Sequence, residues 1–533
     1  MKNLVVSILF ATVLCACGGG NGGSGPTQPA PSVKVLSSAI SRNVVAGTPV
    51  SVVVAIQPSF SPSGTLYATA TDKTGTFAPS VSVHANSDGS YSLTLMTSTT
   101  AATGNVANNL TLNLCSDAAC TMPQAVPSIT VPFSVNVMSS TSVWPGNNLT
   151  TLSAWPGAPD WSMFQGNAAH TGFVPVTVDP NQFTPRWETA YDNNSISSYG
   201  LSNTLTTANG LFYFSGFDFQ NTGSLYAQKE FDGSAAWQYS FASLPYPTVN
   251  PPSVANGTIY IAVGAQQYTY LFGFDANNGA VKFKSLMSSQ WEHFLAPTIG
   301  PVGIYTDGGS YGGLYGFGVG GQQLFSSGTA QADMWTPAVD AAGVYTYVGG
   351  VLKVADPQTG SVLHSISDPS FTNYVYAIGG APVLGAPGSV FVANYANAFL
   401  NGGAIGNTLT NFNTVKNSIA WQVKGSYPST PAYASGVLYT ANNNPVRLEA
   451  RAETDGSLLW SWTPPLAGDT NFASEVLLTN NLAFVSTNLS TYAIDLNSHQ
   501  TVWSFPLSAR LALSKNRVLY LQSSAYLATV NLK

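Results

Sequence analysis

The segment LFGFDANNGAVKF (271–283) decides the fold, because it joins an apolar strand, a polar turn with a glycine and a strand that ends in an aromatic residue. Such a pattern predicts a β-hairpin, in which the glycine supplies the positive φ of the turn. The same order of apolar strand, polar turn and final strand recurs in LYAQKEFDGSAAW (225–237), LKVADPQTGSVLH (352–364), LEARAETDGSLLW (448–460) and TYAIDLNSHQTVW (491–503), the last without the glycine. LYGFGVGGQQLF (314–325) is a looser copy. FNTVKNSIAW (412–421) also lacks the glycine.

A second element precedes most of these hairpins. A turn residue followed by a β-branched or aromatic run occurs eight times, at positions 210, 257, 303, 343, 388, 436, 481 and 516, so the copies lie 35 to 48 residues apart. Four strands in a period of about 40 to 50 residues are typical of a β-propeller blade. The chain has no long run in which apolar residues recur with the 3.6-residue period of an α-helix, and this excludes a helical solenoid.

The last copy, NRVLYLQSSAYLATVNLK, ends before its aromatic strand. A strand of the missing kind lies upstream in FTPRWETA (183–190), centred on Trp187. If this strand completes the final blade, seven complete units and one composite unit form an eight-bladed propeller over residues 160–533. Closure of this kind leaves no long free sheet edge.

Residues 33–137 contain short alternating runs separated by turn residues. About seven strands in about 100 residues predict an immunoglobulin-like β-sandwich, and residues 138–159 are read as the linker. The predicted fold class is therefore all-β, an N-terminal sandwich followed by the propeller. Two cysteines alone do not make a zinc site, because zinc needs four ligands. Cys115 and Cys120 are therefore predicted to form a disulfide, which persists in the oxidising surroundings of an exported protein.

The first sixteen residues form a short basic start and an apolar run that is too short to span a bilayer. They are predicted to be a signal peptide. Leu14-Cys15-Ala16-Cys17 resembles a bacterial lipobox, and this resemblance implies that Cys17 carries the lipid.

Residues 17–32 are rich in glycine and are interpreted as a flexible tether. Gly18 follows Cys17 at the position where an acidic residue would favour retention in the inner membrane. The expected location is therefore the cell envelope, at the outer membrane. The lipid would make the membrane one partner.

Charged residues form only 8% of the chain, and the net charge is −6. Without a basic excess, nucleic acid is not an expected partner.

The hairpins resemble the pyrroloquinoline-quinone-type propeller repeat, whose hallmark is an apolar residue and Asp, then Gly, then Trp. Phe274-Asp275 with Gly279 and Phe283 matches it, as do Asp356 with Gly360, and Trp460 and Trp503 with their turns. The segment DWSMFQGNAAHTGF (160–173) also resembles the segment that opens such propellers.

One branch of this family comprises quinone-dependent dehydrogenases. Membership of this branch would imply a pair of adjacent cysteines at the quinone and carboxylate and amide ligands for calcium. The propeller has no cysteine and few acidic residues, so neither pyrroloquinoline quinone nor calcium is expected, and no metal site is predicted. The other branch includes the lipoprotein scaffold of the outer-membrane β-barrel assembly machine, from which this chain departs by its additional sandwich.

Aromatic residues often precede the innermost strand of a unit, a position that borders the central funnel of a propeller. The candidate rim residues for binding are Trp291, Glu292, His293, Asp333, Trp335, Tyr376 and Tyr427. The alternative is that these aromatic residues only pack between blades. His293, beside Glu292 and Asp333, belongs to the one polar cluster of this set, and no catalytic residue is predicted.

The sequence therefore predicts a lipid-anchored envelope protein whose propeller is a non-enzymatic scaffold for protein partners. Two alternatives stay open at this point, a quinone-dependent dehydrogenase and a carbohydrate-binding surface protein. Fold alone does not decide among them.

Overall fold

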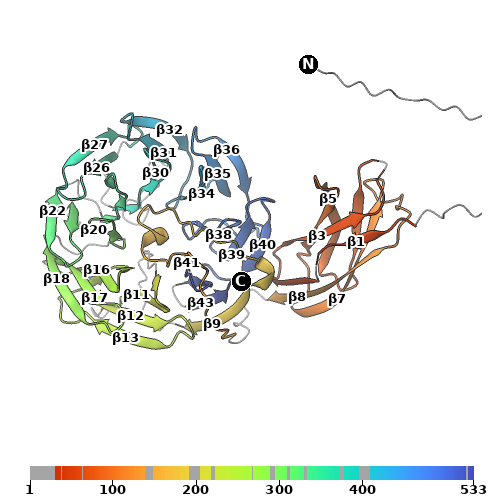
Figure 1. The fold of residues 1–533 in the computed structure, drawn as a ribbon, viewed down its shortest axis with the longest axis horizontal. Coiled ribbons are helices and arrows are strands. Elements are labelled where there is room, and N and C mark those ends of the chain that lie inside the picture. Colours follow the sequence, from red (N-terminus) through yellow and green to blue (C-terminus); the bar gives the residue numbers. More distant parts are fainter. Residues whose placement is uncertain are drawn as a thin grey trace, which may run out of the picture.

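The structure, a computed structural model, describes residues 30–37, 39–62, 64–138, 148–190, 205–217, 223–266, 268–288, 295–308, 313–328, 333–371, 377–394, 408–523 and 526–533. Two 3₁₀ turns, η1 (Phe164–Gly166) and η2 (Pro180–Gln182), accompany 43 strands within these ranges. No helix in the described part of the chain is long and apolar enough to cross a membrane. The predicted all-β class is confirmed (Figure 1).

The N-terminal unit is one hydrogen-bonded sheet of eight strands. These are β1 (Val33–Val35), β2 (Ile40–Val45), β3 (Ser51–Pro58), β4 (Tyr67–Thr71), β5 (Phe77–Ala85), β6 (Tyr91–Thr97), β7 (Gly104–Cys115) and β8 (Ile129–Met138). Their order in the sheet is β1-β3-β6-β5-β4-β7-β8-β2, and β2 pairs with β8 in parallel.

The sheet must curl strongly. Strands β1 and β2 lie at opposite ends of the order, yet only residues 36–39 join them. The five steps from Val35 to Ile40 span about 18 Å at most. The two halves of the sheet therefore face each other around a buried core that includes Val54, Leu93 and Val135. This arrangement is sandwich-like, as predicted, while an immunoglobulin-type topology stays a prediction. The predicted Cys115–Cys120 disulfide is present.

The remaining chain forms a ring of eight sheets (Figure 1). The first four blades contain, from the inner to the outer strand, β10 (Thr206–Ala208), β11 (Leu211–Phe217), β12 (Gly223–Lys229) and β13 (Ala235–Ser240); β14 (Thr248–Val249) with β15 (Ser253–Ala255), β16 (Thr258–Gly264), β17 (Thr269–Asp275) and β18 (Val281–Met287); β19 (Thr298–Ile299), β20 (Ile304–Asp307), β21 (Leu314–Phe317) and β22 (Gln323–Ser327); and β24 (Ala338–Val339), β25 (Val344–Val348), β26 (Val351–Ala355) and β27 (Val362–Ser367).

Blades five to eight follow the same plan. They contain β29 (Val383–Leu384), β30 (Ser389–Asn394), β31 (Thr408–Asn413) and β32 (Ser418–Lys424); β33 (Ala432–Ala434), β34 (Val437–Asn443), β35 (Val446–Ala452) and β36 (Leu458–Trp462); β37 (Leu477–Leu478), β38 (Leu482–Ser486), β39 (Thr491–Asp495) and β40 (Thr501–Phe505); and β41 (Arg510–Leu513), β42 (Val518–Gln522), β43 (Tyr526–Asn531) and β9 (Thr184–Ala190). A separate parallel pair, β23 (Asp333–Trp335) and β28 (Ala377–Gly380), links two interblade connections.

The eighth blade is composite, as predicted. Its outer strand β9 precedes all the other propeller strands in the sequence and pairs antiparallel with β43, with Ala528 opposite Glu188. Trp187 Nε1 donates to the Glu230 carbonyl of blade one at 3.0 Å. The two ends of the propeller are therefore sealed by one sheet.

An aromatic ring on each of several outer strands packs on the hairpin turn of the next blade. A Cβ at Gly233 would lie 3.0 Å from the Trp187 ring, so this turn needs glycine for space as well as for its φ of 73°. The same contact joins Trp237 to Gly279 and Trp421 to Gly456. The predicted role of the outer aromatic residues, filling the wedge between blades, is confirmed at these joints.

The N-terminal sheet packs against the outside of blade seven, where β2 lies beside β40 (Figure 1). Val502 on β40 is 8% exposed, whereas Leu459, which holds the same position of the repeat on β36, is 53% exposed. Arg42 of β2 is also buried, and this burial lowers its pKa to about 10 although the charge of Asp179 acts in the opposite direction.

Candidate functional site

Residues 160–173, here called the axial segment, cross the middle of the ring (Figure 1). Their carbonyl groups accept hydrogen bonds from the innermost strands: Thr207 N–H to Trp161, Val254 to Ser162, Val339 to Ala168, Leu384 to Ala169, Tyr433 to Thr171 and Leu478 to Gly172, all between 2.7 and 2.9 Å. Six blades are thereby tied to one segment. Blade eight is joined through the ion pair of Lys515 with Asp160, at 2.8 Å.

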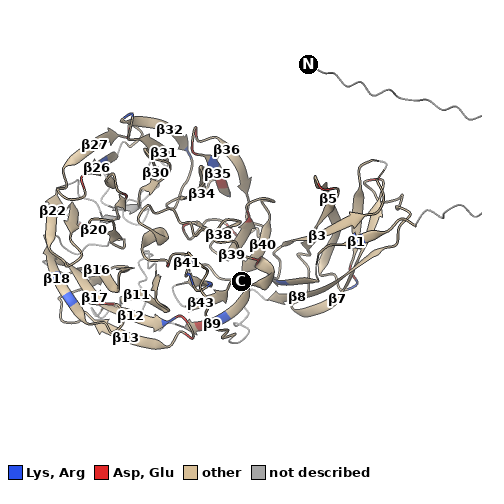
Figure 2. Ribbon diagram, in the orientation of Figure 1, with Lys and Arg blue, Asp and Glu red and all other residues tan. Residues whose placement is uncertain are grey.

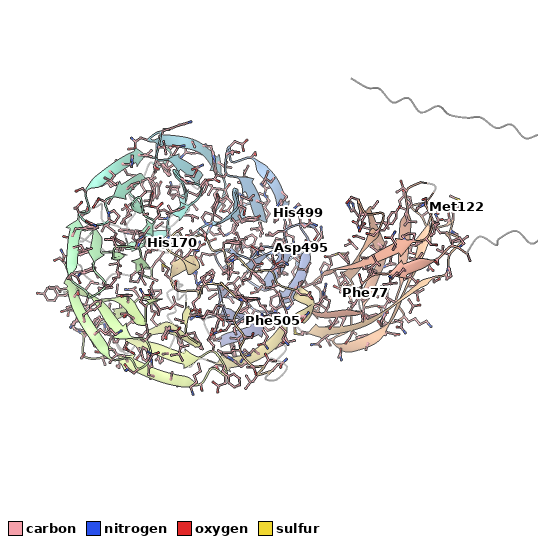
Figure 3. All side chains as sticks on the ribbon, viewed as in Figure 1. Phe77, Met122, His170, Asp495, His499 and Phe505 are labelled. Atoms are coloured by element: carbon pink, nitrogen blue, oxygen red, sulfur yellow. A yellow bond between two sulfur atoms is a disulfide. The ribbon has the colours of Figure 1, made fainter. Side chains whose placement is uncertain are left out.

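His170 of the axial segment connects two further elements at the centre of the ring (Figure 3). Its Nδ1 lies 3.0 Å from the Pro382 carbonyl oxygen, and its Nε2 lies 3.0 Å from Thr298 Oγ1 of blade three. Because a carbonyl can only accept, Nδ1 carries the proton and Nε2 accepts from the hydroxyl. Complete burial lowers the pKa of His170 to about 4, so the ring is neutral at pH 7.

Two further side chains of the axial segment contact its surroundings. Gln165 Nε2 donates to the carbonyl groups of Thr430 and Pro431, both at 3.2 Å. The Phe164 ring meets the His170 ring edge-on and packs with Leu295 and Ala381. The axial segment therefore holds the blades together from inside the ring, through its backbone and through the side chains of His170 and Gln165.

The predicted rim residues fall into two groups. Trp291, Glu292, His293 and Tyr376 lie outside the described residues. Trp335 ends β23 and is 2% exposed, in a core shared by blades three and four. Asp333 opens the same strand, and its side chain is likewise outside the described set.

Tyr427 is fully buried between blades five and six. Burial, and then the nearby Glu449 carboxylate, raise the pKa of Tyr427 to about 12. Neither Tyr427 nor Trp335 presents its side chain to solvent, so the structure does not bring them together as a rim. Their part in binding stays a prediction.

Sequence reasoning missed a buried ion cluster next to Tyr427. Arg447 Nε and Arg451 Nε each donate to the Glu449 carboxylate at 2.7 Å, and Asn442 Nδ2 adds a bond at 3.0 Å. These bonds outweigh the burial that opposes ionisation, and the pKa of Glu449 lies below its ordinary value. The signal was present in LEARAE (448–453), where charged residues replace the apolar residues of LFGF in blade two.

A second buried carboxylate marks the seal between blades eight and one. Tyr520 Oη donates to Glu230 Oε1 at 3.0 Å, and Asn516 Nδ2 donates to Glu230 Oε2. Burial raises the pKa of Glu230. Arg186 beside it donates to Asn531 Oδ1 at 2.7 Å, so these polar groups connect β9 and the chain end to the first blade.

That the protein uses neither pyrroloquinoline quinone nor calcium stays a prediction. All four cysteines of the chain precede the propeller, at positions 15, 17, 115 and 120. Among the described residues, no three His, Cys, Asp or Glu side chains are grouped closely enough to hold a metal ion.

Three solved structures to which the chain is similar are distant from it in sequence. Apo AztD from Citrobacter koseri has a TM-score of 0.34 and 10% identity, covering 49% of this chain and 72% of its own. Hsv2 from Kluyveromyces lactis has a TM-score of 0.35 and 9% identity, over 56% and 94%. The Dos1 propeller has a TM-score of 0.34 and 8% identity, over 70% and 95%.

No curated protein sequence matches the chain. Among protein families, the outer membrane protein assembly factor BamB family matches residues 171–462. These residues begin in the axial segment and end with the outer strand of blade six. Because the match spans more than half of the sequence, the chain belongs to the outer membrane protein assembly factor BamB family.

Proposed function

We propose that this protein is a lipid-anchored envelope protein whose propeller serves as a non-enzymatic scaffold for protein partners. The observation that carries the proposal is the axial segment, which crosses the middle of the ring and accepts backbone hydrogen bonds from the inner strands of six blades. Its buried His170 and Gln165 side chains are committed to holding blades. A ring fastened in this way offers a rigid surface, and rigid partners lose little conformational entropy on binding.

The proposal places the lipid on Cys17, with residues 17–32 as the tether to the N-terminal sheet. Several acyl chains on one cysteine would hold the protein firmly, since each buried CH₂ contributes about 0.8 kcal/mol. Membership of an outer-membrane assembly-factor family supports the outer membrane as the address. The proposal includes no quinone and no calcium.

The anchor is tested by mass spectrometry and fractionation of the full chain. We expect a lipid-modified Cys17 and recovery in the membrane fraction, and we expect a Cys17→Ser variant to lose both. A Cys15→Ser variant is the matched control and should keep the lipid. Unmodified Cys17 in the mature protein would contradict this part of the proposal.

The scaffold role is tested by chemical cross-linking in intact envelopes, followed by purification of the full chain. A partner protein recovered in stoichiometric amounts is the expected result. Dye-linked oxidation of alcohols or sugars by the purified chain, with quinone and calcium supplied, would contradict the non-enzymatic assignment. Repeated cross-linking without a stoichiometric partner would contradict the scaffold.

A further inference from the structure

Tyrosine side chains gather on the rim between blades one and two. Tyr246 lies in the connection between these blades and is 58% exposed, and Tyr268, just before β17, is 49% exposed. The Gln266 N–H donates to the Pro245 carbonyl at 3.1 Å, which fixes the two loops against each other.

The backbone at Tyr246 has a φ of 51°, in the left-handed region that bulky residues rarely adopt. Such conformations persist where the surroundings impose them, and they are concentrated at functional sites. Among the described aromatic residues that precede an inner strand, Trp335, Tyr427 and Phe472 are buried. Tyr246 departs from them by pointing to solvent.

Strands β17 and β18 continue this surface. Tyr270 is the register partner of Leu286, and Phe272 is the partner of Lys284, so these four side chains share the face that looks toward blade one. Lys284 Nζ lies 3.9 Å from the centroid of the Tyr270 ring. Figure 2 shows basic residues on β18 at the outside of the ring.

The charge of this patch indicates which kind of ligand it can bind. Lys284 is exposed and has no carboxylate within ion-pairing distance in the described part of the chain. Lys284 gives the aromatic patch a positive charge, so the patch complements an acidic ligand rather than a basic one. Exposed tyrosine clusters are typical of the energetically dominant positions of protein interfaces.

We propose that Tyr246, Tyr268, Tyr270 and Lys284 form a docking site for an acidic, tyrosine-containing peptide segment of a partner protein. This inference rests on the scaffold function and names the chemistry of one ligand. The tyrosine rings stack on apolar and aromatic side chains of the segment, and Lys284 pairs with a carboxylate. Binding should weaken with added salt, because the ion pair is exposed.

The test uses the full chain and a fluorescently labelled random copolymer of glutamate and tyrosine. Anisotropy titration should show binding that is at least about tenfold tighter than for polyglutamate, a difference that one good aromatic contact can supply. Tyr268→Ser and Lys284→Gln should each weaken copolymer binding by about tenfold.

Tyr526→Ser on blade eight and Lys416→Gln on blade five are the matched controls, because both residues are exposed and lie outside the patch. They should leave the affinity unchanged, and unchanged melting temperatures should show that all four variants fold. Equal binding by patch and control variants would overturn the inference. Dextran sulfate that binds as tightly as the copolymer, with the same dependence on Tyr268 and Lys284, would assign the patch to acidic polysaccharide instead.

The two proposals fail separately. If patch variants still cross-link to the envelope partner and the copolymer does not bind, the docking site is wrong and the scaffold stands. If no envelope partner is captured while the copolymer binds as expected, the scaffold role fails and the patch stands.

Discussion

Trp187 shows how one side chain can close a large ring. Its indole packs on Gly233, stacks with Phe212 at 5.6 Å and donates to the Glu230 carbonyl, so it contacts the first blade from the last. Trp460 makes the corresponding contact in blade six, where it stacks at 4.3 Å on His499 in place of a glycine.

We predict that Trp187→Ala lowers the free energy of unfolding by about 3 to 5 kcal/mol, the usual cost of removing a large buried aromatic residue. Trp460→Ala, which removes a partly exposed ring, should cost clearly less. Denaturant unfolding followed by circular dichroism measures both, and equal losses would contradict the special place of Trp187.

The burial of His170 predicts that the stability of the fold depends on pH. The pKa of His170 falls from 6.5 in the unfolded chain to about 4 in the folded protein. The unfolded state therefore takes up a proton first, and stability is lost as the pH falls from about 6.5 toward 4, by up to roughly 3 kcal/mol. His170→Asn should show a shallower decline than the parent protein over this window. Parallel stability curves for the two proteins would rule out the proposed burial of a neutral imidazole.

At the residue scale the sequence identified the outer aromatic residues and their glycine partners, because both follow a fixed offset from the turn. It did not reveal that Trp335 and Tyr427 are buried. The side chain of an aromatic residue before an inner strand can point into the core or into solvent. Which of the two occurs depends on connections that belong to other blades. Tyr246 makes the outward choice at a cost in backbone strain.

At the scale of elements, alternation of apolar and polar residues located the strands of both units. The pairing of β2 with β8 in parallel was not predictable, because a period of two residues does not say which neighbour a strand will take. The axial segment was noticed only as a family-like opening sequence. Its role depends on hydrogen bonds to residues such as Tyr433 that are more than 200 positions away.

The loop closed by Cys115 and Cys120 joins the end of β7 to the turn before β8. Asp117 inside it accepts backbone N–H bonds from Thr121 and Met122, and the second of these bonds contributes most to lowering the pKa of Asp117. We predict that the double variant Cys115→Ser/Cys120→Ser destabilises the N-terminal sheet by about 2 kcal/mol, as expected for a short closed loop.

Reduction of the parent protein should reproduce that loss, and the double variant should not respond to reductant. Thermal unfolding with and without reductant provides the measurement. An unchanged N-terminal transition in the double variant would show that the disulfide does not support this sheet.

At the scale of the whole molecule, the N-terminal sheet and the propeller are packed together through β2 and β40. We predict that Val502→Asp separates them, because a carboxylate cannot be buried at that contact without a partner. Small-angle X-ray scattering should then show a larger radius of gyration. Leu459→Asp, at the equivalent exposed position of blade six, should leave the radius unchanged. A compact Val502→Asp variant would contradict the docked arrangement.

The central claim is that the propeller is an eight-bladed ring sealed by β9 and β43, and a cysteine pair across that seam tests it most directly. Ala528 and Glu188 are directly opposite each other, and opposite residues of antiparallel strands lie about 4.5 to 5.5 Å apart, within disulfide range. In a chain with the natural cysteines replaced by serine, Glu188→Cys/Ala528→Cys should form a disulfide on mild oxidation. The offset pair Glu188→Cys/Val530→Cys should not. A fast-migrating oxidised band for the first pair alone is the predicted result, and free thiols in the first pair would contradict the closed ring.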